Sequence, residues 1–208
     1  MTQTEFDRRI EALLLLQNPC VLCPNRCAAD RNSRSGKCNS SGVMEIASSV
    51  LHFGEEPCVS GKSGSGNIFF AHCNMRCVYC QNHEISQPAA AAKFRHVTPA
   101  ELSRVMLDLQ DRGAANINLV SGSHFLPQIT AAIKFASADG HQIPILYNTN
   151  GYDEVETLKL LEGIIDIYLP DLRYSSERDG FEFSGARDYP LFSRLAVKEM
   201  FRQVSDAT

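Results

Sequence analysis

The sequence predicts an α/β fold whose core is a parallel sheet of about four strands, preceded by an N-terminal segment rich in cysteine. Two observations predict the sheet. Short apolar runs, rich in β-branched or aromatic residues, recur from residue 67 onward, and segments with helical spacing of apolar residues separate them. Strands that are apolar throughout and alternate with helices belong to parallel sheets covered by those helices. A third observation, four cysteines within residues 20–38, marks off the N-terminal segment.

The expected strands are 67–71, 117–120, 143–147 and 164–169. Because crossovers between parallel strands are right-handed, the C-terminal ends of all four strands meet at one rim. Functional sites in such folds are built at that rim.

The clearest expected helix begins at Thr98, where Thr98 and Glu101 form a capping box with Pro99 at the first helical position, and it ends at Gly113. Three further helices are expected: one that carries 129–136 and ends at Gly140, one from Asp153 to Gly163, and one around 191–200.

Residues 1–60 are expected to form a separate helix and cysteine-rich metal-binding segment, and residues 61–208 the core. An amphipathic helix carries Phe6, Ile10, Leu13 and Leu14 on one face. The loop-rich stretch after it has too few apolar residues to fold without additional stabilisation, such as a bound metal.

Composition narrows the classes of function. The chain has 44% hydrophobic and 21% charged residues and a net charge of −4, as globular proteins with a substantial core do. Without a block of basic residues, nucleic acid and anionic membranes are not expected partners. No apolar run reaches the ~18 residues of a membrane-spanning helix, and no signal peptide is recognisable. We therefore expect a cytoplasmic protein whose eight cysteines stay reduced and bind metal.

Three cysteines directly follow the first expected strand, in the pattern C-x3-C-x2-C: Cys73, Cys77 and Cys80. Thiolates are the ligands of iron–sulfur clusters, and closely spaced cysteines on one loop hold three corners of a cubane. The fourth iron is then open to another ligand. The alternatives are a zinc site completed by His72 or His83, and buried apolar cysteines.

A second group has four cysteines, Cys20, Cys23, Cys27 and Cys38, in the pattern C-x2-C-x3-C-x10-C. Four thiolates make a closed site for zinc or for an auxiliary iron–sulfur cluster, and spacing does not separate the two metals. The remaining cysteine, Cys58, is expected to be a free thiol.

The C-x3-C-x2-C loop, with an aromatic residue before its last cysteine, resembles that of the radical S-adenosylmethionine (radical SAM) superfamily. More narrowly, the chain resembles uncharacterised proteins related to pyruvate formate-lyase activating enzymes. The segments that carry the narrower resemblance are 64–70, 80–82, 20–27, 148–152 and 167–171. The resemblance implies a partial (β/α) barrel of the radical SAM type.

The resemblance also implies cofactors and roles. Cys73, Cys77 and Cys80 would ligate a [4Fe-4S] cluster whose fourth iron binds the amino and carboxylate groups of SAM, and Tyr79 would lie against the adenine. One electron from a donor would cleave SAM to methionine and a 5′-deoxyadenosyl radical. That radical would abstract hydrogen from a substrate, which in the related activases is a glycine of a protein partner.

Further SAM-binding positions follow the later strands. Activating enzymes have a Gly-Gly-Glu-like segment after the second strand, and this chain has Ser121-Gly122-Ser123-His124. Ser121 and Gly122 still offer backbone groups, but the carboxylate is missing. His124 is either a ligand contact or a satisfied polar residue.

Positions after the third and fourth strands also match the SAM site of activating enzymes. Asn148, Thr149 and Asp171 correspond to residues that lie near the SAM carboxylate. The alternative for Asn148-Thr149-Asn150-Gly151 is that it forms an ordinary turn.

The sequence therefore leaves two functions open: a radical SAM enzyme of the activating type, and a truncated, non-catalytic iron–sulfur or zinc protein. Related barrels resemble six βα units, whereas four strands are visible here. The expectation is an open partial barrel, a barrel completed by a partner, or a fragment of a longer protein.

Overall fold

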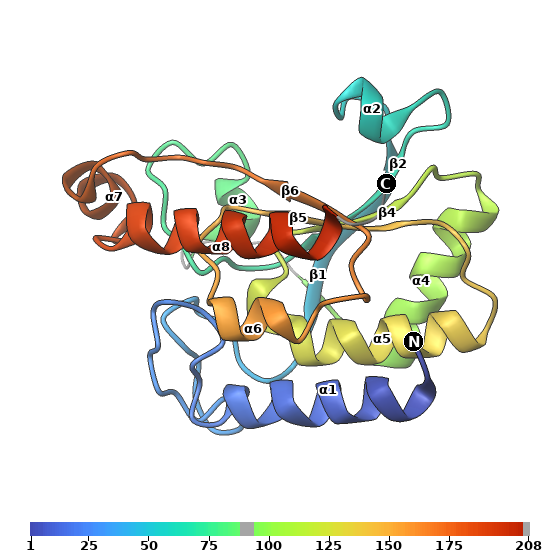
Figure 1. Cartoon of the computed structure of the whole chain (residues 1–208), viewed down its shortest axis with the longest axis horizontal. Helices are drawn as coiled ribbons and strands as arrows, with labels where there is room; N and C mark the ends of the chain where they lie inside the picture. The colour runs from blue at the N-terminus through green and yellow to red at the C-terminus, as the bar shows by residue number, and fades with distance from the viewer. Residues whose placement is uncertain (88–93, 206–208) are drawn as a thin grey trace.

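The computed structural model describes residues 1–87 and 94–205, which form one six-stranded mixed sheet with helices packed against it (Figure 1). The strands are β1 (Glu45–His52), β2 (Ser65–Phe70), β3 (Arg95–His96), β4 (Ile117–Val120), β5 (Ile145–Thr149) and β6 (Ile167–Pro170). The helices are α1 (Gln3–Gln17), α2 (Pro57–Ser60), α3 (His83–Ser86), α4 (Pro99–Asp111), the 3-10 helix η1 (Ser123–Phe125), α5 (Leu126–Ala138), α6 (Val155–Lys159), α7 (Glu177–Ser184) and α8 (Tyr189–Val204).

The strand order is β3-β1-β2-β4-β5-β6. Strands β2, β4, β5 and β6 are parallel, which confirms the α/β fold and the four parallel strands predicted from the apolar runs. The register aligns Phe69 with Val120 and Val120 with Asn148. The C-terminal ends of the parallel strands therefore lie at one edge, consistent with a partial barrel of the radical SAM type.

Helices α4 and α5 pack against each other beside the sheet, and α1 packs on α5 as an outer layer (Figure 1). The predicted capping box at the start of α4 is present: the Thr98 side chain accepts from the N–H of Glu101, and the Glu101 carboxylate accepts from the N–H of Thr98 at 2.8 Å. Helix α8 covers α6 and β6. The main apolar core lies between these helices and the sheet.

Strand β1 was not expected from the sequence. It lies in the N-terminal segment, yet it pairs antiparallel with β2 along its length and continues the sheet to β3. Its sequence, Glu-Ile-Ala-Ser-Ser-Val-Leu-His, alternates poorly, and most of it is only half buried. A strand stabilised mainly by its pairing with β2 leaves little pattern in the sequence.

Three helices also differ from expectation. In α1, Phe6 and Leu13 are buried as predicted, but Leu14 is 47% exposed because it lies outside the stripe that faces α5. Helix α6 is shorter than predicted, with five residues, and α7 was not predicted.

A second, smaller apolar cluster lies beneath the loop that follows β2, with Met75, Tyr152, Ala186 and Tyr189 at its centre. The Tyr189 hydroxyl lies 2.7 Å from the carbonyl oxygen of Asn150 and 2.8 Å from that of Asp171. Helix α8 thereby joins the ends of β5 and β6, the strands that form one side of the site.

Candidate active site

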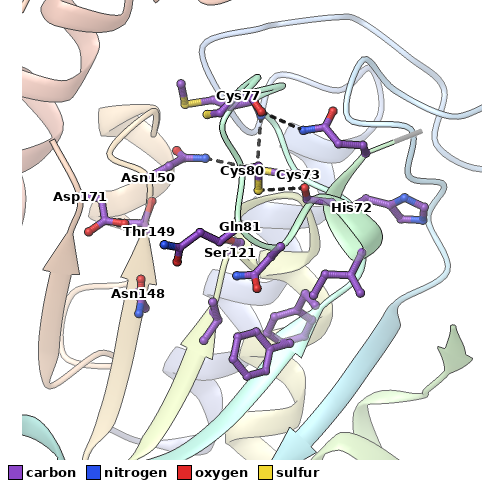
Figure 2. Close-up of a pocket in the computed structure, with 18 of the residues that line it drawn as sticks. His72, Cys73, Cys77, Cys80, Gln81, Ser121, Asn148, Thr149, Asn150 and Asp171 are labelled. Carbon is purple, nitrogen blue, oxygen red and sulfur yellow. Dashed lines mark hydrogen bonds between the residues drawn. The ribbon is translucent and has the colours of Figure 1, made fainter. Parts of the chain in front are cut away.

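A cavity of about 550 Å³ opens at the C-terminal edge of the parallel strands. Its walls are the loop after β2 and the ends of β4, β5 and β6 (Figure 2). Most of the residues predicted to form the site line it: Cys73, Cys77, Tyr79, Cys80, Ser121, Asn148, Thr149 and Asp171. The structure thus brings together side chains that lie almost a hundred residues apart in the sequence.

Residues 73–80, called the thiol loop below, carry all three cysteines that line the cavity. The loop is held at both ends. At its start, His124 donates from Nε2 to the carbonyl oxygen of Ala71 at 2.8 Å. Near its end, the N–H of Val78 donates to the carbonyl oxygen of Phe183 at 2.9 Å.

His124 is therefore a positioning residue, but it is only partly satisfied, because its buried Nδ1 has no partner among the described residues. Burial lowers its pKa to about 3, so the imidazole is neutral and keeps the proton it donates to Ala71. It is not among the residues that line the cavity.

The Cys73 thiol accepts from the N–H of Met75 and from the Asn150 amide, both at 3.4 Å (Figure 2). Burial, together with the neighbouring Cys77 and Cys80 thiols, raises the pKa of Cys73 to about 11, although the two donors oppose the rise. The three thiols therefore repel one another as thiolates, and a positively charged metal core would relieve that repulsion.

The donor set fits an iron–sulfur cluster. Three free thiols from one loop face a cavity with room beside them, and soft thiolates are the ligands such clusters use. A single-ion site fits less well, because the described residues contain no group of three or more His, Cys, Asp or Glu side chains arranged to hold one ion. His72, a possible fourth zinc ligand, directs its Nε2 to Glu45 at 2.9 Å, away from the thiols (Figure 2).

Oxygen and nitrogen groups from three strands face the thiols across the cavity. Asn148 and Ser121 are joined through their backbones, with the N–H of Ser121 donating to the carbonyl oxygen of Asn148 at 2.9 Å. Ser121 adopts a positive φ of 58°, which costs a non-glycine residue free energy and turns the chain toward the cavity. Gly122 does not line the cavity; a Cβ there would lie 2.6 Å from Ile129, so its role is close packing on α5.

Thr149 and Asp171 lie side by side at the ends of β5 and β6 (Figure 2). The Thr149 hydroxyl donates to Asp153, a buried carboxyl that also accepts from Tyr147 at 2.9 Å. Burial raises the pKa of Asp153 to about 6, although both hydroxyl donors lower it. Thr149 therefore serves partly to hold the end of β5 in place.

Several residues that line the cavity were not assigned from the sequence, and two of them, Arg173 and Asn150, contact predicted site residues. Arg173 lines the wall and pairs with Asp171 at 2.7 Å, and Asn150 reaches Cys73. Arg173 follows the strand by three positions without any motif. Asn150 precedes Gly151, whose positive φ of 74° confirms a turn. Because a turn already explains an Asn-Gly pair, the sequence carries no separate sign of the contact between Asn150 and Cys73.

The N-terminal cysteines lie outside this cavity. Cys20, Cys23 and Cys38 are buried, Cys27 is half buried, and all are free thiols. Burial raises the pKa of Cys27, but the N–H groups of Lys37 and Ala29 and the Cys20 thiol outweigh it, so its pKa is lowered. The predicted free thiol Cys58 is exposed on α2.

A parallel sheet with a three-cysteine loop at its C-terminal edge defines a cofactor-dependent α/β protein. Residues 67–192, more than half of the chain, match the Radical SAM superfamily, and the chain belongs to that superfamily. Its members in general bind a [4Fe-4S] cluster and SAM. No helix among the described residues has the length and apolarity needed to cross a membrane.

The chain is also similar to the uncharacterized protein MJ0674 of Methanocaldococcus jannaschii. The two are 29% identical over 188 residues, which cover 88% of this chain and 54% of the relative. The chain thus spans about half the length of that curated relative.

Proposed function

We propose that this protein is a radical SAM enzyme of the activating-enzyme type, which cleaves SAM reductively and abstracts hydrogen from a substrate. One observation carries the proposal: three free thiols of a single loop share a cavity with polar side chains from the ends of β4, β5 and β6. Three thiols leave a coordination position open for SAM, as catalytic metal sites require.

Cys73, Cys77 and Cys80 would hold the [4Fe-4S] cluster. When bound and reduced by an external electron donor, the cluster supplies the electron that cleaves SAM to methionine and a 5′-deoxyadenosyl radical. The residues of the chain itself position the ligands of the cluster. Asn150 and the N–H of Met75 donate to the Cys73 sulfur, and such hydrogen bonds set both the orientation of a ligand and the potential of a cluster.

The opposite wall suits the methionine part of SAM, which carries one ammonium and one carboxylate. Asp171 and Arg173 present one group of each sign at the cavity, and the Asn148 amide lies between them and Ser121. We assign the Arg173 guanidinium to the SAM carboxylate and the Asp171 carboxylate to the ammonium, because charge-assisted hydrogen bonds are the strongest available there. Tyr79, also on the thiol loop, would lie against the adenine.

The substrate that we propose is a glycine of a protein partner. Support comes from exposed apolar side chains on segments that line the cavity or contact them: Val78 and Tyr79 on the thiol loop, Leu172 between Asp171 and Arg173, and Phe183, whose carbonyl accepts from Val78. Grouped apolar exposure of this kind marks surfaces that bind macromolecules.

The first test is SAM cleavage. Anaerobically reconstituted protein with dithionite and SAM should form 5′-deoxyadenosine, and Cys77→Ala should not. Cys58→Ala, which removes an exposed cysteine that does not line the cavity, should behave as wild type. Wild-type protein that holds iron at the thiol loop but forms no 5′-deoxyadenosine would support the non-catalytic alternative instead.

The second test concerns the partner. Leu172→Glu places a charge on a side chain that is 63% exposed, so it should weaken hydrogen abstraction from a protein partner. SAM cleavage without partner should be unchanged. Equal loss of both reactions would show that Leu172 acts on the SAM site and would count against a protein substrate.

A further inference from the structure

Arg31, in the N-terminal segment, is 1% exposed and makes no ion pair with a described carboxylate. Its Nη2 donates to Ser40 Oγ at 3.1 Å and to the carbonyl oxygens of Ser41 and His124 at 2.6 and 3.3 Å. Its Nε has no hydrogen-bond partner among the described residues. Burying a cation is costly unless an anion compensates it, and the described part of the chain supplies no carboxylate for Arg31.

The groups that face the rest of the guanidinium are thiols. Nη1 of Arg31 lies 3.6 Å from the sulfur of Cys20. A Cβ at Gly36 would lie 3.2 Å from the sulfur of Cys27, 3.5 Å from that of Cys38 and 3.7 Å from Arg31 Cδ. These two sulfurs and the arginine therefore lie around one point of the backbone, where an added Cβ would crowd the Cys27 sulfur.

Cys23 completes the group: it is buried, and it follows Cys20 by three residues in the same loop-rich segment. Its sulfur accepts from the Asn25 amide at 3.7 Å. All four sulfurs thus belong to one neighbourhood, which contains Arg31 as its charged member.

We propose that Cys20, Cys23, Cys27 and Cys38 hold a tetrathiolate metal centre, and that Arg31 neutralises part of its negative charge. Four thiolates with Zn²⁺, or with a [4Fe-4S]²⁺ core, carry a net charge of about −2. Either centre supplies the anion that Arg31 lacks. Among the described residues no three of these thiols are already arranged to hold one ion, so binding requires them to move together around the metal.

The irregular backbone of this segment also fits a metal centre. Residues 18–44 contain neither helix nor strand, apart from an isolated bridge between Gln17 and Cys20. A stretch of this length without secondary structure depends on side-chain contacts for its order, and a metal supplies such folding free energy directly.

The proposed centre touches the active-site side of the molecule. The Asn25 amide that contacts Cys23 also donates to the carbonyl oxygen of Asn74 on the thiol loop, at 2.6 Å. From the thiol loop, Arg76 donates to the carbonyl oxygen of Lys37 at 3.0 Å. These two hydrogen bonds therefore connect the segment that carries the proposed centre to the thiol loop.

The test separates this centre from the one at the cavity. In full-length protein carrying Cys73→Ala, Cys77→Ala and Cys80→Ala, we expect about one zinc, or about four iron and four sulfide, per chain. Zinc or iron analysis identifies the metal. Adding Cys38→Ser should remove it, and adding Cys58→Ser should not. Failure of the SAM-cleaving function leaves this measurement unaffected, because the triple variant lacks the cavity thiols.

Substitution of Arg31 provides a second test of the metal centre, one that leaves all four cysteine ligands in place. Arg31→Met should lower the chelator concentration that strips half of the metal by roughly 10- to 100-fold, as loss of an outer-shell partner does. Arg31→Lys, which keeps the charge, should retain most of the affinity. Arg34→Met removes an exposed charge from the same segment and serves as the matched control.

Two results would overturn the proposal: no bound metal in the triple variant after anaerobic purification and reconstitution with iron or zinc, or metal that survives Cys38→Ser. Equal chelator resistance of Arg31→Met and wild type would overturn the role of Arg31.

Discussion

The two cysteine groups of this molecule differ in number, burial and surroundings. Cys73, Cys77 and Cys80 are half buried beside a cavity, and polar side chains from several strands face them. The N-terminal group has four thiols, three of them fully buried, and its nearest charge is the enclosed Arg31. Three ligands with free space suit a site that reacts, whereas four ligands with an enclosed counter-charge suit a site that stabilises.

The largest expected effect separates these two roles. Cys77→Ala should lower SAM cleavage at least about a thousandfold while leaving the free energy of unfolding nearly unchanged, because the loop around it is held by backbone contacts. Cys20→Ala should instead lower that free energy by on the order of 5 kcal/mol through loss of the metal. Chemical denaturation and 5′-deoxyadenosine assays on both variants measure the contrast. The comparison fails if both variants lose stability and activity alike.

Arg173→Met should act on the cavity alone. Loss of a charge-assisted hydrogen bond to the SAM carboxylate should raise KM for SAM by roughly 10- to 100-fold. Metal content at both cysteine groups should stay the same. Arg178→Met, on the exposed face of α7, is the control and should leave KM unchanged.

Asp153, which accepts from the cavity-lining Thr149, makes the stability of the folded protein depend on pH. Its pKa in the folded protein, about 6, lies above the ordinary value of 3.8, so the folded state binds more protons between these two values. Stability from this group is therefore greatest below about pH 4, falls as the pH rises through 6, and changes by at most about 3 kcal/mol.

Asp153→Asn should remove that component of the pH dependence. Urea unfolding between pH 4 and 7 measures it as the difference between variant and wild type. Asp139→Asn, on an exposed carboxyl at the end of α5, is the control and should follow wild type. An unchanged slope in Asp153→Asn would show that this carboxyl is ionised throughout the range.

The smallest expected effect concerns the contact between the two regions. Asn25→Ala removes the hydrogen bond to the Asn74 carbonyl and should lower the free energy of unfolding by about 1 kcal/mol. If the N-terminal segment supports the thiol loop, KM for SAM should rise as well. Asn32→Ala, at an exposed position of the same segment, should change neither quantity.

Local patterns in the sequence predicted what depends on local physics. The capping box at Thr98 and the apolar stripe of α4 are present as expected, since both arise from contacts within three or four residues. The four parallel strands were recognisable because their residues are mainly apolar; β2, β4 and β5 are largely buried, and β6 is half buried. Strand β1 was not, because its order comes from pairing with β2 rather than from its own composition.

The sequence by itself determined the parallel α/β fold, the thiol loop after the first parallel strand and eight of the residues that line the cavity. These features follow from positions at strand ends and from cysteine spacing, which can be read directly from the sequence. Only the tertiary structure decided that Arg173 and Asn150 join the site, that Gly122 packs away from it, and that Arg31 lies buried among thiols without a carboxylate. These facts depend on which distant segments meet, and charge compensation becomes visible only when all neighbours of a buried group are known.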